Sequence, residues 1–214
     1  MATNLTVTIE TDGVTLPGDL VVPDEARGVV VFAHGSGSSR LSPRNKAVAS
    51  GLTRAGFGTL LFDLLTAEEE RTDARDAALR FDIAMLARRL TGAVGWLDGQ
   101  PAAHGLPLGL FGASTGAAAA LVTAAQHPGQ VRAVISRGGR PDLAGAALTQ
   151  VRAPVLLIVG EEDTQVLGLN FAARRDLPPV TELAVIEGAG HLFEEPGALD
   201  QVTALAADWF TRHV

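Results

Sequence analysis

One serine lies in a context that could make its hydroxyl a nucleophile. The segment Gly112-Ala113-Ser114-Thr115-Gly116 follows a short apolar run and precedes an alanine-rich run. A G-x-S-x-G pattern between a strand and a helix is typical of a sharp turn that exposes the serine at the end of a sheet. The helix that follows directs positive partial charge and free N–H groups toward that serine. The pattern predicts Ser114 as a nucleophile, and a Gly/Ser turn without chemistry is the alternative.

A serine hydroxyl needs a general base before it can attack a carbonyl group. His191 lies in the glycine-flanked loop 188–193, directly after the last predicted strand and C-terminal to Ser114. The other four histidines lie in less suitable places, at His34, His104, His127 and His213. We therefore predict His191 as the base, and we interpret His34 as a structural hydrogen-bonding residue.

A carboxylate is expected to orient the histidine ring and to stabilise its protonated form. Asp163 follows a predicted strand, and the order Ser114, Asp163, His191 is the one found when a nucleophilic serine sits on a strand–turn–helix elbow. Asp163 is preferred to Glu161 and Glu162 because the turn should direct the last carboxylate across the sheet. Asp142, which follows the preceding strand, is the competing candidate.

Acyl transfer also needs hydrogen-bond donors for the oxyanion. The backbone N–H of Thr115, just after the nucleophile, is one predicted donor. The loop His34-Gly35-Ser36-Gly37-Ser38-Ser39 follows another apolar run and should supply the second. We predict the N–H of Ser36 for this role, with Gly35 as its rival.

Several arginines fall in loops after predicted strands, near the expected active face. They are Arg40, Arg44, Arg137 and Arg140. Arginine binds carboxylate or phosphate groups in a bidentate manner, so Arg40, Arg137 and Arg140, together with Gly35, are candidates for substrate binding. Ordinary surface pairing with Asp or Glu is the alternative.

The elements that must position these residues alternate along the chain. Two short β-like runs, 5–9 and 19–22, come first, with turns expected at Asp12-Gly13 and Pro17-Gly18. A polar connection is expected at 66–76, before a long helix whose apolar positions run from Leu79 to Leu97. Further strands are predicted at 28–33, 57–62, 108–111, 131–135, 155–159 and 182–186, and further helices at 43–55 and 198–212.

This alternation predicts an α/β fold with a mainly parallel sheet between helices and an antiparallel N-terminal edge. We expect residues 1–214 to form a single domain. About twenty residues separate the strands predicted at 131–135 and 155–159, which leaves no room for a lid domain.

Composition excludes several classes of site and partner. The 214 residues carry a formal net charge of −7, which argues against nucleic acid or an anionic membrane as the main partner. The absence of cysteine excludes disulfides, thiolate metal sites and a cysteine nucleophile. The N-terminal segment Met1–Glu10 has neither a basic region nor a long apolar one, so we expect no signal peptide and a cytoplasmic location.

Taken together, the segments His34-Gly35-Ser36-Gly37 and Gly112–Gly116 with Asp163 and Gly190-His191 resemble the α/β-hydrolase fold over nearly the whole chain. The compact length and the HGSGSSR loop more narrowly resemble small bacterial dienelactone-hydrolase-like proteins. Members related to the named enzyme use a cysteine in this elbow, where this chain has Ser114. The resemblance therefore implies a serine carboxylesterase-type hydrolase acting on small to medium acyl substrates, rather than dienelactone hydrolysis.

Other functions remain open on the same residues. A thioesterase, amidase, perhydrolase or cofactor-free haloperoxidase would use the same three side chains, and a non-catalytic binding protein could share the fold. A nucleotide site is disfavoured because the G-x-G-x-x-G and G-x-x-x-x-G-K-[ST] spacings are absent. No metal or organic cofactor is implied. The expected partner is a small ester-like molecule, and a homodimer is left open.

Overall fold

The chain forms one eight-stranded sheet in a computed structural model that describes residues 2–214. Met1, the first residue of the segment expected to lack a signal peptide, lies outside the described residues. The strand order is β1-β2-β4-β3-β5-β6-β7-β8. The strands are β1 (Thr3–Thr11), β2 (Val14–Val22), β3 (Val29–Ala33), β4 (Gly58–Phe62), β5 (Leu108–Ala113), β6 (Val131–Arg137), β7 (Val155–Gly160) and β8 (Thr181–Ile186).

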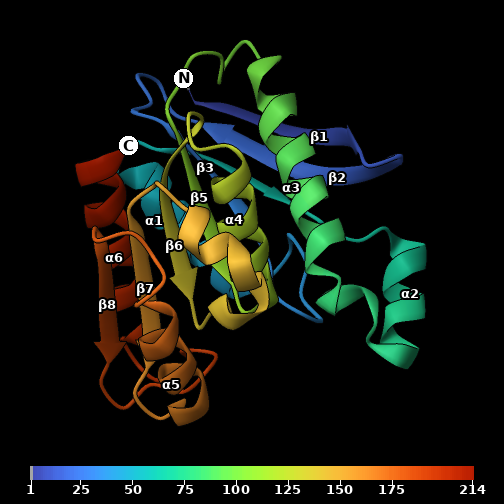
Figure 1. The fold of residues 1–214 in the computed structure, drawn as a ribbon. Coiled ribbons are helices and arrows are strands. Elements are labelled where there is room, and N and C mark those ends of the chain that lie inside the picture. Colours follow the sequence, from blue (N-terminus) through green and yellow to red (C-terminus); the bar gives the residue numbers. More distant parts are fainter. Residues whose placement is uncertain (1) are drawn as a thin grey trace.

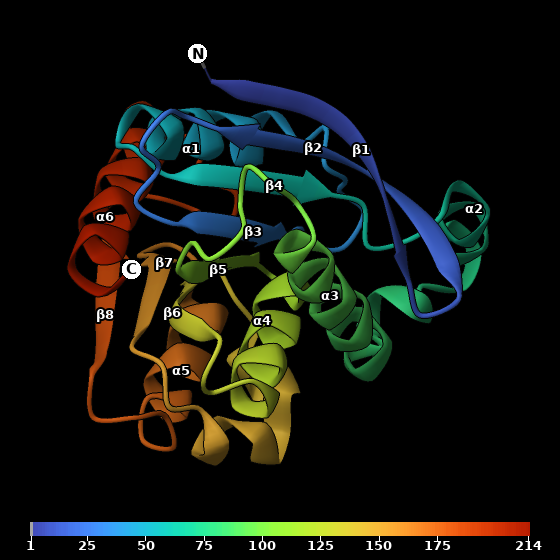
Figure 2. The same ribbon diagram turned by 90° about the horizontal axis from the view of Figure 1, so that it is seen from above.

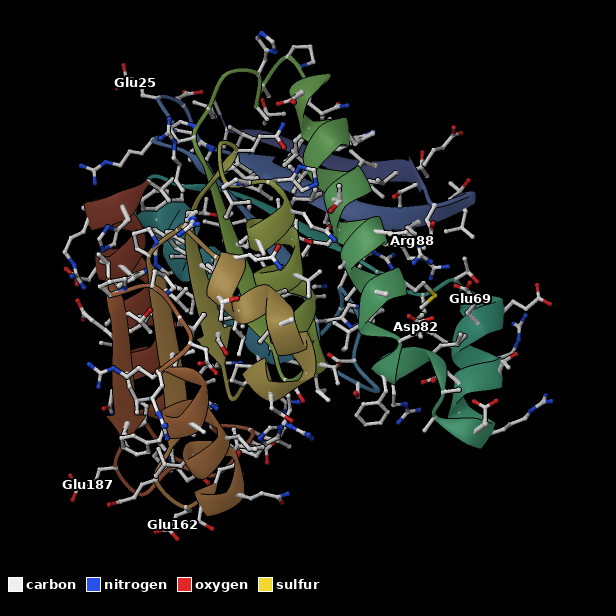
Figure 3. The ribbon with its side chains drawn as sticks, viewed as in Figure 1. Glu25, Glu69, Asp82, Arg88, Glu162 and Glu187 are labelled. Carbon is white, nitrogen blue, oxygen red and sulfur yellow. The ribbon has the colours of Figure 1, made fainter. Side chains whose placement is uncertain are left out.

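The predicted antiparallel N-terminal edge is confirmed. β1 pairs with β2, and β2 pairs with β4, in antiparallel register, whereas every pair from β4 to β8 is parallel. The carboxyl ends of the six parallel strands therefore meet at one edge of the sheet. Figure 3 marks this edge with Glu162 and Glu187, which lie just after β7 and β8, at the opposite end of the molecule from Glu25.

Helices cover both faces of the sheet (Figures 1 and 2). α1 and α6 pack on one face, and α3 and α4 pack on the other. Neighbouring residues of β5 divide between the two cores, since Leu110 packs toward α3 and α4 and Phe111 toward α1 and α6. The helices are α1 (Pro43–Arg54), α2 (Ala67–Asp76), α3 (Ile83–Asp98), α4 (Thr115–Gln126), α5 (Thr164–Ala173) and α6 (Ala198–His213), with 3₁₀ segments η1 (Leu79–Phe81) and η2 (Pro141–Gln150).

The turn expected at Pro17-Gly18 is wrong, because both residues lie inside β2. Proline lacks an N–H and is tolerated in a strand only where no neighbouring strand needs that donor. β2 is paired with β1 along its whole length, but its pairing with β4 begins only at Gly18. The Pro17 carbonyl accepts from the Asp63 N–H just beyond β4, and no residue of β4 pairs with Pro17 and needs its missing donor.

The polar connection expected at 66–76 is also wrong, because most of it forms α2. Thr66 caps this helix by accepting from the Glu69 N–H, and the Glu69 carboxylate accepts from the Thr66 N–H in return. Only Asp73 of the helix is buried, so the sequence of α2 has no apolar stripe that would predict a helix. The long helix that follows begins at Ile83 rather than Leu79, with Asp82 as its cap.

The connection between β6 and β7 contains only η2, which packs against α4. No lid is inserted between these strands, as the sequence predicts. None of the helices in residues 2–214 is long and apolar enough to cross a membrane.

Candidate active site

Ser114 occupies the strained turn that the G-x-S-x-G pattern predicts. It lies between β5 and α4 with φ 51° and ψ −119°, a conformation that side-chain-bearing residues rarely adopt. Two backbone hydrogen bonds join the turn to the end of β6 and the loop after it, from the Ser114 N–H to the Arg137 carbonyl and from the Arg140 N–H to the Ser114 carbonyl. A side chain at Gly116 would collide with the carbonyl groups of Ala33 and His34, so the loop after β3 can approach the serine.

His191 and Asp163 are brought together by the loops after β8 and β7. His191 Nδ1 lies 2.6 Å from Asp163 Oδ2. The side chain of His191 is 40% exposed and that of Asp163 is 14% exposed, so the ring faces solvent while the carboxylate supports it from below. A hydrogen bond from Nδ1–H to a carboxylate leaves Nε2 available as a proton acceptor.

The histidine loop lies next to the serine turn. A methyl group built on Gly138 would lie 3.5 Å from His191 Cε1 and 3.2 Å from its carbonyl oxygen. Gly138 directly follows Arg137, whose carbonyl holds the Ser114 N–H. The ring of His191 therefore lies beside Gly138, the residue after the one whose carbonyl binds the Ser114 N–H.

The loop after β3 brings Ser36 beside Thr115. Their hydroxyl oxygens lie 3.1 Å apart, and a methyl group on Gly35 would lie 2.9 Å from Ser114 Cβ. Within residues 2–214, neither the Ser36 N–H nor the Thr115 N–H donates to a backbone acceptor. Two backbone N–H groups without a backbone acceptor therefore lie next to Ser114, where they could donate hydrogen bonds to the carbonyl oxygen of a substrate.

His34 anchors this loop from beneath. Its Nε2 accepts from the Leu64 N–H at 2.9 Å, so its Nδ1–H donates to the Gly35 carbonyl at 3.0 Å. Burial lowers the pKa of His34, although the Gly35 hydrogen bond and Asp63 oppose this. The ring is thus a neutral spacer between the loops after β3 and β4. Asp63 holds the far end of the same loop by accepting from the Arg40 N–H at 2.7 Å.

The arginines that were predicted to bind substrate do not form one cluster, and two of them pair with separate carboxylates. Arg40 pairs with Asp63 and Asp19, and Arg140 forms two hydrogen bonds with Asp142. Asp142 is the competing candidate for the carboxylate that orients the histidine. It accepts hydrogen bonds from Arg140 and has no contact with His191 among the hydrogen bonds of the described residues.

Arg137 is placed differently from the other arginines. Its guanidinium is buried over the ring of Phe193, with 5.7 Å from Cζ to the ring centroid, and its Nε and Nη1 have no hydrogen-bond partner within the described chain. Burial, with a smaller contribution from Arg44, lowers its pKa to about 10. Arg44 itself pairs with Glu194 at 2.9 Å.

Three supporting residues were not predicted from the sequence. The Glu161 carboxylate accepts from the Gly188 N–H and that of Glu195 from the Gly190 N–H, both at 3.0 Å, so the two bracket the loop that carries His191. Asn170, fully buried in α5, donates to the Gly139 carbonyl and so holds the turn beside that loop. No sequence pattern predicts these contacts, because each joins loops that meet only in the folded chain. Among residues 2–214, no group of three or more His, Cys, Asp or Glu could hold a metal ion.

Comparison with known proteins relates the chain to one family. Residues 16–213 match the dienelactone hydrolase family. The crystal structure of a dienelactone hydrolase from Anabaena variabilis has a TM-score of 0.96 and 53% identity, and the match covers 100% of this chain and 99% of that one. Est1E from Butyrivibrio proteoclasticus has a TM-score of 0.81 at 16% identity, covering 97% of this chain and 98% of that one, which shows a shared fold.

Two curated proteins, from two strains of Mycobacterium tuberculosis, are each 59% identical over 201 residues. The match covers 94% of this chain but 44% of those proteins, so the chain spans less than half the length of these relatives. Both carry the provisional name of phosphoribosyl transferase. That name describes a protein of which more than half has no counterpart in this chain.

Proposed function

The chain belongs to the dienelactone hydrolase family, and from this premise we propose that it is a serine hydrolase that cleaves carboxylic esters through an acyl-Ser114 intermediate. The contact between His191 Nδ1 and Asp163 Oδ2 at 2.6 Å carries this proposal. A serine turn needs a base in a defined tautomer, and this contact supplies one.

In the first half of the reaction, Ser114 Oγ attacks the ester carbonyl carbon while His191 Nε2 takes the hydroxyl proton. Asp163 holds the ring and stabilises the imidazolium. The tetrahedral intermediate collapses as His191 returns the proton to the leaving alcohol. Water then attacks the acyl-serine with His191 again as base, which releases the acid and restores Ser114.

The negative charge of the tetrahedral oxygen would be met by the backbone N–H groups of Ser36 and Thr115. Their support is that both amides are free of backbone acceptors within residues 2–214 and lie beside Ser114. The start of α4 adds a favourable field at the same point. Ser114, His191, Asp163, Ser36 and Thr115 are thus the proposed catalytic set.

We propose neutral esters of small to medium size as substrates. Arg40 and Arg140 already have carboxylate partners, so binding of an acidic substrate group has less support than the sequence suggested. The connection between β6 and β7 is too short to cover a long acyl chain. Thioesters, amides and peracids remain alternatives, since the same residues would process them.

The test compares hydrolysis of p-nitrophenyl acetate and butyrate by the wild-type protein and by Ser114→Ala. Turnover by the wild type that falls by at least about 10³-fold in Ser114→Ala supports the proposal. Turnover that is absent, or equal in both proteins, contradicts it. Labelling by a fluorophosphonate distinguishes the remaining case, because a non-catalytic binding protein would leave Ser114 unlabelled.

A further inference from the structure

A pocket of about 290 Å³ lies beside the proposed oxyanion amides. Gly35, Ser36 and Thr115 are among the residues that line it, whereas Ser114 and His191 do not line it. An ester carbonyl held by the Ser36 and Thr115 amides would therefore lie at the mouth of the pocket, and one arm of the ester would point inward. The volume is close to the lower end of ligand sites, about 300 Å³, which suits a short arm.

Most of the charge on the pocket walls is internally balanced. Asp73, which is 3% exposed, accepts from the backbone N–H of Arg80 at 2.9 Å and from its Nε at 2.6 Å. These two residues thus form an ion pair whose opposite charges largely cancel. Leu64, Leu65 and Leu86 supply apolar surface beside it.

The remaining charge on the walls belongs to Glu70 of α2, a residue that is exposed to solvent while it lines the pocket. No side-chain hydrogen bond or ion pair joins its carboxylate to any of residues 2–214. Burial, and then the nearby charge of Asp63, raises the pKa of the Glu70 carboxyl, while Arg40 opposes this. An unpaired carboxylate on a partly apolar wall attracts hydrogen-bond donors and repels anions.

We infer that this pocket receives one arm of the ester and that Glu70 makes it selective for an arm bearing a hydroxyl group. The inference rests on the proposed function, of which it names the substrate class: short hydroxylated esters. An aliphatic arm of the same length fits the leucine wall but makes no hydrogen bond to the Glu70 carboxylate. A carboxylate-bearing arm meets repulsion.

The experiment measures binding rather than turnover, so it can fail independently of the proposed activity. Ligand-observed NMR at pH 8 gives dissociation constants of Ser114→Ala for six esters in two matched series. The first series varies the alcohol arm in 2-hydroxyethyl, propyl and carboxymethyl butyrate. The second varies the acyl arm in methyl 3-hydroxybutyrate, methyl butyrate and monomethyl succinate. In the series whose varied arm enters the pocket, we expect the hydroxylated ester to bind about five- to tenfold more tightly than the aliphatic one, and the acidic ester to bind most weakly.

Ser114→Ala combined with Glu70→Gln should abolish most of this preference and improve binding of the acidic ester about fivefold. Glu68→Gln is the matched control, because Glu68 lies on the same helix and is exposed like Glu70 but does not line the pocket. The inference is overturned if the three esters bind equally in both series, or if Glu70→Gln and Glu68→Gln have the same effect. If the wild-type protein hydrolyses none of the esters but the hydroxylated ester still binds more tightly, the result contradicts the proposed function and leaves the pocket inference intact.

Discussion

The side chain of Asp163 bonds to His191 instead of capping the helix that it precedes. Asp163 is the N-terminal cap residue of α5, a position where an aspartate ordinarily accepts a hydrogen bond from the first turn. Here it makes no such bond, and its Oδ2 lies 2.6 Å from His191 Nδ1. The helix forgoes a stabilising cap so that the carboxylate can hold the imidazole, which indicates that this carboxylate serves the site more than the fold.

Replacement of Asp163 by asparagine should therefore damage catalysis more than stability. An amide can turn its NH₂ toward the ring and hold the wrong tautomer, so we expect kcat on p-nitrophenyl butyrate to fall about 10³- to 10⁴-fold. Asp142→Asn is the matched control, because Asp142 pairs with Arg140 and not with His191. A larger loss in Asp142→Asn than in Asp163→Asn would reverse the assignment.

His34 should make folding stability depend on pH. Burial holds the pKa of folded His34 below its ordinary value of about 6.5, so the unfolded chain takes up a proton first as the pH falls. The contribution of the neutral ring is complete above about pH 6.5 and is lost progressively below it. Urea unfolding between pH 7.5 and 5.5 should show a smaller loss of stability in His34→Gln than in the wild type.

The control for the pH dependence of folding stability is His104→Gln, which alters an exposed histidine outside the site. Its stability should fall with pH as steeply as that of the wild type. Equal slopes in the wild type and His34→Gln would mean that His34 does not cause the acid sensitivity.

Three of the loops of the candidate site could be predicted because each follows a strand with a simple signature. The runs before Gly112, before Gly160 and before His34 are continuously apolar, as buried parallel strands must be, so their carboxyl ends had to share one edge. The ion-pair partners of the arginines could not be predicted in this way. Arg40 and Arg140 are neutralised by Asp63 and Asp142, and such pairing depends on side-chain directions that no spacing specifies.

Helix α2 was missed for a different physical reason. Its ten residues bury only Asp73, so a search for apolar periodicity finds nothing there. The threonine at 66 with glutamate three residues later is a capping-box signature that does predict a helix start. The pocket beside α2 could not be inferred at all, because its walls come from segments that meet only in the folded chain.

Removal of the unpaired charge of Arg137 should stabilise the protein. The fall in the pKa of Arg137 to about 10 corresponds to roughly 3 kcal/mol of disfavoured charge, part of which the contact with Phe193 offsets. We expect Arg137→Met to raise Tm by a few degrees, measured calorimetrically at neutral pH. Arg140→Met, at a partly exposed arginine paired with Asp142, should change Tm little.

A lower Tm in Arg137→Met would mean that the guanidinium has an anionic partner in solution. The same variant also tests a role in binding acidic substrates. If Arg137 binds an acidic substrate group, Arg137→Met should slow hydrolysis of monomethyl succinate more than that of methyl butyrate. Equal effects on both esters would contradict that role.

Arg89 should be the main attachment of α2 to the rest of the molecule. Its side chain is 3% exposed and donates to both carboxylate oxygens of Glu69, at 2.6 and 2.7 Å, and to the Leu64 carbonyl at 2.7 Å. Figure 3 shows Glu69 on α2 turned toward α3. The hydrogen bonds from Arg89 hold the pKa of Glu69 below its usual value.

Arg89→Met leaves the Glu69 carboxylate and the Leu64 carbonyl without these donors. We expect a loss of about 3 to 5 kcal/mol in the free energy of unfolding, measured by urea denaturation. Arg88→Met is the control, since the neighbouring Arg88 is exposed, pairs with Asp12 at 2.9 Å and should contribute less than about 1 kcal/mol. Because Glu70 lies on α2, Arg89→Met should also weaken the preference for hydroxylated esters, whereas Arg88→Met should leave it intact. Similar losses of stability in the two variants would show that α2 is held by something other than the Glu69–Arg89 pair.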